Sequence, residues 1–391
     1  MKIFQCTTLF TPAPELTRTC IVVEGGRIKD LVSPAEADRI PDAERIDLGG
    51  RLVGPGLVDI HCHGAMGSDF ADGTIEDVSK AATHHLRQGT TTLLAGVGSC
   101  TLQEMKQACA TTRALMKILR NLQGVHLEGP YFSLQWFGCH LREMIRNPDR
   151  AEWSLLEADA DVIRLMTLAP ELPGALELIR HFSRLGTVFS IGHSDASYEE
   201  IERAADAGLT HSTHFFNAMP DAHRVNRVLL PGVQESVLLM DRLSTEIIGD
   251  GIHVGARLVE LVHRFKGPGQ TALVSDALRG VGCPPGDYAF GPRNGKLCRL
   301  IDQPRVGIVP DDPTKLASSA IVLSDALQIL GGQTRIPLSD LWQMASLTPA
   351  RIVHLDRRKG SIAAGKDADL LVLTPDRTVA DVFIGGERVA R

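Results

Sequence analysis

The stretch Leu57-Val58-Asp59-Ile60-His61-Cys62-His63-Gly64 combines an apolar run with two closely spaced histidines. The aliphatic residues at its start predict a short buried strand. Because His61 and His63 are two residues apart, their imidazoles leave the same side of an extended backbone and can bind one divalent metal ion together. Cys62 points to the opposite side, and we interpret it as a packing residue. Alone, such a pair is a weak signal, since it also occurs as a polar strand end.

The composition is that of a large globular protein. The chain has 391 residues, 43% apolar and 23% charged, with a net charge of -6, which suits one large domain with a smaller appendage. Basic residues are scattered, so we expect neither nucleic acid nor a membrane surface as a partner. The first residues lack the apolar segment of a signal peptide, and no stretch is long and uncharged enough to span a bilayer. We therefore expect a cytoplasmic location, with the eight dispersed cysteines reduced.

Both ends of the chain predict short strands joined by tight turns. A hairpin pattern surrounds Gly25-Gly26, and a similar pattern surrounds Gly385-Gly386 near the other end. We expect residues 1–52 and 359–391 to build one composite β-sandwich domain.

Between the ends, strand-like and helix-like segments alternate, which is typical of a parallel sheet covered by helices. A helical pattern over residues 75–88 stops at Gly89, a residue that favours helix ends. The strand-like segments are residues 57–63, 90–95, 124–128, 162–168, 187–191, 210–214, 245–248 and 271–275. Eight such units predict an α/β fold, a (β/α)8 TIM-type barrel over residues 53–358, with its active site at the carboxyl ends of the strands.

Metal-compatible side chains stand at the ends of five of these predicted strands. They are His61 and His63 after the first, Glu128 after the third, His193 after the fifth, His214 after the sixth and Asp276 after the eighth. Because a barrel brings the carboxyl ends of its strands to one mouth, the joint pattern predicts a single metal-dependent site. Taken singly, His193 reads equally well as a helix cap and His214 as a core histidine.

Six motifs resemble, in order, those of the N-acetylglucosamine-6-phosphate deacetylase family of the amidohydrolase superfamily. They are His61-Cys62-His63, His126-Leu127-Glu128-Gly129-Pro130, Gly192-His193-Ser194-Asp195-Ala196, Thr213-His214-Phe215-Phe216-Asn217-Ala218-Met219, Asp250-Gly251-Ile252-His253 and Ser275-Asp276-Ala277. The resemblance covers nearly the whole chain. It implies a hydrolase that removes the acetyl group from an N-acetylated amino sugar, with N-acetylglucosamine 6-phosphate as the first choice, and it also implies a homodimer.

The resemblance implies a role for each matching residue. Glu128, His193 and His214 hold the main metal ion, Asp276 is the general acid/base, and His140 stabilises the oxyanion; Asn217, Ala218 and His253 contact the substrate. The first-strand pair varies in this family, and since His61 and His63 are both retained here, one or two ions are expected. Many binuclear amidohydrolases bridge their two metals with a carbamylated lysine on the fourth strand. No lysine occurs between Lys117 and Lys266 here, so the resemblance leaves Glu128 as the bridging group. Zinc is the first choice, with iron, manganese or cobalt as alternatives.

The chain departs from the family in the segment expected to hold the phosphate. The family's Arg-Glu-Pro-Gly segment is absent, and Arg224 and Arg227 are the remaining candidates for phosphate binding. Ser318 also stands where the family usually has a glycine. These departures keep two alternatives open. One is a deacetylase of a non-phosphorylated N-acetyl amino sugar or another N-acyl amine, and the other is a non-catalytic metabolite-binding barrel.

Overall fold

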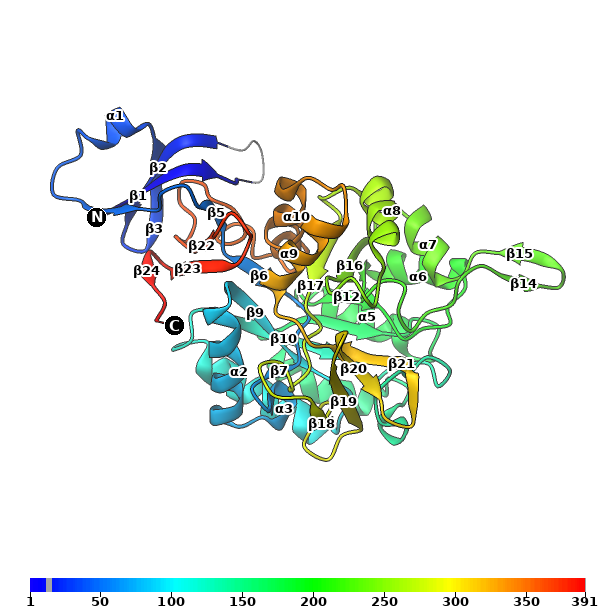
Figure 1. The fold of residues 1–391 in the computed structure, drawn as a ribbon. Helices are drawn as coiled ribbons and strands as arrows, with labels where there is room; N and C mark the ends of the chain where they lie inside the picture. The colour runs from blue at the N-terminus through cyan, green and yellow to red at the C-terminus, as the bar shows by residue number, and fades with distance from the viewer. Residues whose placement is uncertain (12–15, 391) are drawn as a thin grey trace.

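The computed structural model describes residues 1–11 and 16–390 and contains a parallel barrel joined to a β-domain (Figure 1). The barrel strands run in the order β17-β16-β13-β12-β11-β10-β9-β6. Their bounds are β6 Leu57–Asp59, β9 Thr90–Val97, β10 Leu122–Glu128, β11 Ile163–Leu168, β12 Val188–Ile191, β13 Leu209–Ser212, β16 Ser244–Ile248 and β17 Thr271–Val274. The predicted (β/α)8 architecture is confirmed, with every predicted strand present.

The barrel closes between its last and first strands through few hydrogen bonds. The backbone N–H of Asp276 donates to the carbonyl of His61 at 2.8 Å, and that of Ser275 donates to the Asp59 carboxylate at 3.3 Å. The first strand is shorter than predicted. It ends at Asp59, because the backbone N–H of His63 turns to the carbonyl of Ala277, 2.9 Å away. Both histidines therefore lie in the loop just beyond β6.

Helices cover the outside of the barrel. The principal ones are α2 Ile75–Arg87, α3 Leu102–Leu115, α5 Ala175–Ser183, α6 Tyr198–Ala207, α7 Val233–Leu239, α8 Ala256–Lys266, α9 Leu323–Gln333, α10 Leu338–Met344 and α11 Leu347–Ile352. The predicted helix before Gly89 is α2. It begins after Thr74, whose hydroxyl accepts the N–H of Asp77, and stops before Gly89, which has a φ of +99°. Among the described residues, no helix has the length and apolar character needed to cross a membrane.

Strands from both ends of the chain form the terminal β-domain. They are β1 Lys2–Leu9, β2 Leu16–Glu24, β3 Arg27–Val32, β4 Glu44–Asp47, β5 Leu52–Pro55, β22 Leu370–Leu373, β23 Val379–Ile384 and β24 Glu387–Arg388. All belong to one continuous sheet, not to two separate sheets. The sheet curls over its own core, since Phe4 of β1 meets Phe383 of β23 edge to face at 4.9 Å, although two strands separate them in the sheet. The predicted domain boundaries stay a prediction.

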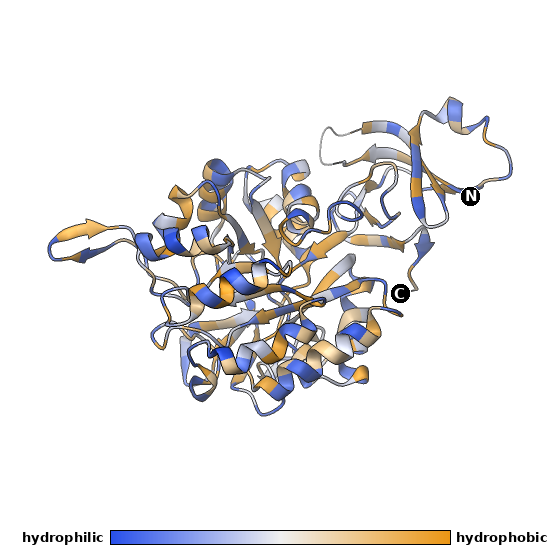
Figure 2. Cartoon of the chain, turned by 180° about the vertical axis from the view of Figure 1, so that it is seen from behind, coloured by the Kyte–Doolittle hydropathy of each residue, from blue (hydrophilic) through white to orange (hydrophobic). Residues whose placement is uncertain are grey.

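Two additions to the barrel were not predicted from the sequence. A four-stranded antiparallel sheet follows the last barrel strand, with β18 Gly286–Ala289, β19 Leu297–Asp302, β20 Arg305–Val309 and β21 Asp312–Ser319. A hairpin of β14 His223–Val225 and β15 Val228–Leu230 projects from the barrel as an arm (Figure 1). Figure 2 shows hydrophobic residues along this arm, and all of residues 223–230 are exposed.

Candidate metal centre and active site

The six predicted strand-end residues meet at one mouth of the barrel. They form two groups, Glu128 with His193 and His214, and Asp276 with His61 and His63. Within each group the candidate ligand atoms all lie within 4.8 Å of one another, and every member is buried. His193, His214 and Asp276 have φ values of +52°, +27° and +47°. Such strained conformations persist where the surroundings impose them, and here they occur directly after strand ends.

Glu128 lies between the two groups. Its Oε1 atom is 3.2 Å from Nε2 of both His193 and His214, and its Oε2 atom is 3.3 Å from Nε2 of His63. Oε1 also lies 3.4 Å from Nε2 of His61, so this one carboxylate faces both groups, as a ligand shared between two ions would.

Hydrogen bonds fix the tautomer of one histidine in each group, and the ring nitrogens lie close together within each group. His193 Nδ1 must donate to the carbonyl of Trp136 at 2.7 Å, so its Nε2 is unprotonated in the neutral ring, and burial lowers the pKa of His193 to about 4. This Nε2 is only 2.9 Å from His214 Nε2, while Nε2 of His61 and of His63 are 3.2 Å apart. Acceptors this close beside a carboxylate fit a shared cation, so the residues present suit divalent metal ions.

Glu246 holds His61 in the required tautomer, a role that the sequence did not reveal. Its carboxylate accepts the Nδ1–H of His61 at 2.5 Å and lies 3.2 Å from Nε2 of His211 on its other oxygen. Carboxylates behind ligating histidines fix ring orientation and raise ligand basicity. The available signal was a carboxylate inside a predicted strand, directly before two isoleucines.

Asp276 is held by the sheet that follows the barrel. Ser318 Oγ–H donates to the backbone carbonyl of Asp276 and lies 3.2 Å from its Oδ1. Ser318 has a φ of +66°, the left-handed region in which glycine is unstrained, which explains the glycine expected at this position. The serine found here accepts the backbone strain and adds a hydroxyl beside Asp276.

His140 presents an N–H to the same mouth. Its Nδ1 accepts the backbone N–H of Ser99 at 3.1 Å, so the neutral ring carries its proton on Nε2, 3.3 Å from Glu128. Phe290, the first residue after β18, packs against the rings of His63 and His140 at 4.6 and 5.1 Å between ring centroids. An aromatic cover of this kind limits water beside the candidate ligands. The sequence did not indicate Phe290.

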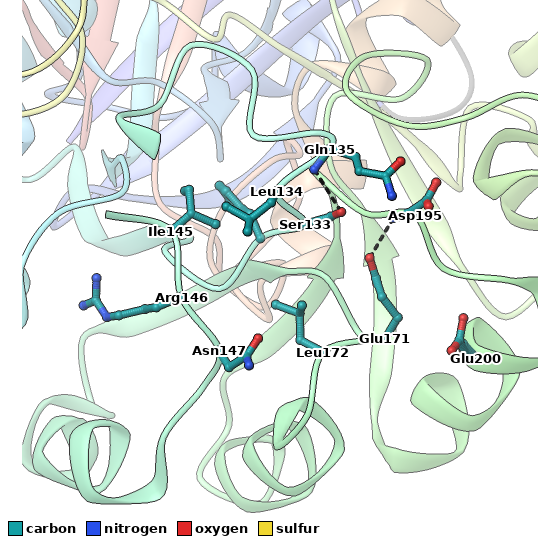
Figure 3. A pocket seen from close by; sticks show the side chains of 11 residues that line it. Ser133, Leu134, Gln135, Ile145, Arg146, Asn147, Glu171, Leu172, Asp195 and Glu200 are labelled. Carbon is teal, nitrogen blue, oxygen red and sulfur yellow. Dashed lines mark hydrogen bonds between the residues drawn. The ribbon is translucent and has the colours of Figure 1, made fainter. Parts of the chain in front are cut away.

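A cavity of about 550 Å³ lies against the loop that carries Asp195, with Glu171 on the same wall (Figure 3). Glu171 accepts the N–H of Asp195 and the hydroxyl of Ser194, both at 2.7 Å, and burial raises the pKa of Glu171. Asp195 in turn accepts the indole N–H of Trp136 at 2.9 Å. Trp136 thus anchors its loop to the residues around His193.

The substrate candidates lie in two different places. Asn217, Ala218 and His253 line a cavity of about 550 Å³ at the barrel mouth, together with Glu128, His193, His214 and Asp276. Asp250 accepts His253 Nδ1–H at 2.6 Å, so Nδ1 carries the proton of the neutral ring. Arg224 and Arg227 instead lie on the exposed β14–β15 arm and are not among the residues lining this cavity. Their role in phosphate binding stays a prediction.

Comparison with known proteins gives the family of this chain. The amidohydrolase family pattern matches residues 52–389. An N-acetylglucosamine-6-phosphate deacetylase of Bacillus subtilis is 31% identical over 82% of this chain and 80% of its own, and an N-acetylgalactosamine-6-phosphate deacetylase of Escherichia coli O157:H7 is 30% identical over 86% and 87%. The crystal structure of N-acetylglucosamine-6-phosphate deacetylase from Pasteurella multocida, 28% identical, superposes with a TM-score of 0.92 over the full length of both chains. The chain therefore belongs to the metal-dependent amidohydrolase family and, within it, to the N-acetylglucosamine-6-phosphate deacetylases.

Proposed function

We propose that this protein is a cytoplasmic enzyme that hydrolyses the acetamide of N-acetylglucosamine 6-phosphate to glucosamine 6-phosphate and acetate. The observation that carries the proposal is the position of Glu128, which lines the cavity and whose carboxylate lies within 3.4 Å of the ring nitrogens of both histidine-containing groups. Asp276 and His140 border the same groups and supply the proton-transfer and hydrogen-bonding functions that amide hydrolysis requires.

We infer that divalent metal ions bind here: Glu128, His193 and His214 would hold one, and His61, His63 and Asp276 would hold a second. Zinc suits the nitrogen and carboxylate donors, and iron, manganese or cobalt are the alternatives. When bound, the metal lowers the pKa of water to about 7 and polarises the amide carbonyl.

Asp276 moves the proton in this scheme. Its Oδ1 accepts a proton from the attacking water and returns it to the leaving nitrogen, which would otherwise depart as a poor amine anion. Ser318 holds the residue at the edge of the cavity during both transfers. The Nε2–H of His140 donates to the carbonyl oxygen as negative charge develops there.

Asn217, the backbone of Ala218 and Nε2 of His253 are the groups that we assign to the sugar phosphate. The rival candidate is a deacetylase of a non-phosphorylated N-acetyl amino sugar. The observation in its favour is that neither Arg224 nor Arg227 lines the cavity. A phosphate dianion favours fixed cationic donors.

Steady-state measurement of acetate release separates these candidates. We expect the metal-loaded protein to show a higher kcat/KM for N-acetylglucosamine 6-phosphate than for N-acetylgalactosamine 6-phosphate or for unphosphorylated N-acetylglucosamine. Asp276→Asn should lower kcat by about 10²- to 10⁴-fold. A preference for the plain sugar would establish the rival activity. Absence of turnover on every N-acyl amine, in protein with bound metal, would identify a non-catalytic binding barrel.

We infer a homodimer in which the partner subunit covers the β14–β15 arm. Its large apolar side chains Val225, Val228, Leu229 and Leu230 are between 41% and 59% exposed. A two-stranded hairpin has marginal stability by itself in water, and a contiguous apolar patch of this kind marks an interaction site.

The mass measured by light scattering after gel filtration should be that of a dimer, and the double substitution Val228→Ser with Leu229→Ser should halve that mass. The control is Leu258→Ser, at an exposed position on α8. A monomeric wild-type protein at micromolar concentration would contradict the inference.

A further inference from the structure

A separate cluster of metal-compatible side chains lies on the outer side of the loop that carries the catalytic histidines. Asp59 ends β6, Cys62 stands between His61 and His63, and His85 lies in the last turns of α2. Asp59, Cys62 and His85 are all 0% exposed. Their candidate ligand atoms lie within 4.8 Å of one another, the same limit that the two catalytic groups meet.

The contacts inside this cluster resemble those of the catalytic groups. Cys62 Sγ is 3.1 Å from Nε2 of His85, close to the 3.2 Å between the ring nitrogens of His61 and His63. The carbonyl oxygen of Gly64, 3.0 Å from the same His85 nitrogen, supplies a fourth donor atom. One sulfur, one nitrogen and two oxygens are thus gathered in a space sealed from solvent.

Hydrogen bonding leaves this cluster incomplete. Asp59 Oδ2 and His85 Nδ1 are buried without a hydrogen-bond partner. Asp59 receives two long backbone contacts of 3.3 Å on Oδ1 and one hydrogen bond from the side chain of Ser275. In the described part of the chain, no lysine or arginine forms an ion pair with Asp59. A buried carboxylate that lacks both a cation and a full set of donors is costly, and a bound cation would remove that cost.

We propose that Asp59, Cys62 and His85 form a further, structural divalent metal site, suited to Zn²⁺, behind the catalytic histidines. The set contains the thiolate, imidazole and carboxylate ligands that zinc takes in closed four-coordinate sites. The carboxylate and the thiolate together balance the charge of the ion, and the Cys62 proton leaves to solvent as the zinc–sulfur bond forms. The proton that His85 Nε2 donates to the Gly64 carbonyl moves to the unpartnered Nδ1 of the same ring, which frees the Nε2 lone pair for the ion. Because the cluster is sealed, the ion enters during folding. The bound ion would stabilise the end of β6 and the loop that carries His61 and His63.

Cobalt substitution tests the site independently of catalysis. The catalytic groups contain only nitrogen and oxygen donors, so a thiolate-to-cobalt charge-transfer band in the near ultraviolet reports a sulfur ligand. Protein expressed in minimal medium with cobalt in place of zinc should show this band. Cys62→Ser should abolish it, and Cys139→Ser should retain it, which controls for the cysteine that lines the catalytic cavity.

Metal content and X-ray absorption complete the test. By elemental analysis, Cys62→Ser should contain one metal ion per chain fewer than Cys139→Ser. If Cys62→Ser does not fold, zinc-edge absorption of the wild-type protein still decides, because a sulfur neighbour at about 2.3 Å is required. A wild-type protein without the charge-transfer band, a band lost in Cys139→Ser instead of Cys62→Ser, or a zinc environment without sulfur would overturn the proposal. None of these outcomes bears on the deacetylase activity.

Discussion

Replacing Glu246 by glutamine is expected to weaken metal binding while leaving the fold intact. The carboxylate accepts the Nδ1–H of His61 at 2.5 Å and the backbone N–H of His214 at 3.0 Å, and is fully buried. Glutamine has the same shape and keeps one acceptor oxygen. The substitution therefore removes mainly the negative charge that makes His61 a better ligand.

Loss of a carboxylate behind a ligating histidine costs about 10- to 100-fold in metal affinity, or about 1.4 to 2.7 kcal/mol. The affinity is measured by competition with a metal chelator, and kcat/KM is then measured at limiting and at saturating metal. We expect Glu246→Gln to lose affinity and to regain part of its activity at saturating metal. The control is His211→Gln, which touches the other oxygen of Glu246 and no candidate metal ligand, and should have the smaller effect. Equal affinity and equal activity in Glu246→Gln and wild type would refute the reasoning.

Three further substitutions test the active site and the stability of the fold. His140→Ala should lower kcat by about 10²- to 10³-fold with little change in KM, measured at saturating metal, because only the developing oxyanion loses its donor. Gly54→Ala should lower the free energy of unfolding by about 1 to 3 kcal/mol in urea titrations, since its Cβ would lie 2.3 Å from the Trp342 ring, which is anchored by its own hydrogen bond. Burial opposes ionisation of Asp367, but Lys359 at 3.0 Å and neighbouring Arg358 hold its pKa below the usual value. The stability that this carboxylate contributes is present at neutral pH and lost as pH falls below about 4, so Asp367→Asn should cost about 2 kcal/mol at pH 7 and nothing in acid.

The parts of the fold that were predictable are those with a local signal. Alternating strand and helix patterns identified the eight barrel strands, and Gly89 marked the end of α2. The ligand candidates were predictable for a related reason, because a barrel brings every strand end to one mouth. His193 and Glu128, 65 positions apart in sequence, lie 3.2 Å apart for that reason alone.

Other features depend on contacts that no local pattern records. The first strand ends at Asp59 because the loop after the last strand, at Ala277, takes the hydrogen bond of His63. Ser318 reaches Asp276 only because a separate antiparallel sheet folds back over the barrel mouth. The outward arm carries Arg224 and Arg227 away from the cavity, although both follow closely the motif that lines it.

The amino-acid sequence by itself determined the barrel, the terminal β-domain and the set of metal-compatible strand ends, since these follow from periodicity and from the order of elements along the chain. Only the tertiary structure decided which nitrogen of His61 and of His193 is free, that Glu246 supports His61, and that Cys62 meets Asp59 and His85. The physical reason is that protonation and hydrogen bonding depend on neighbours within about 3 Å. Those neighbours come from distant parts of the chain.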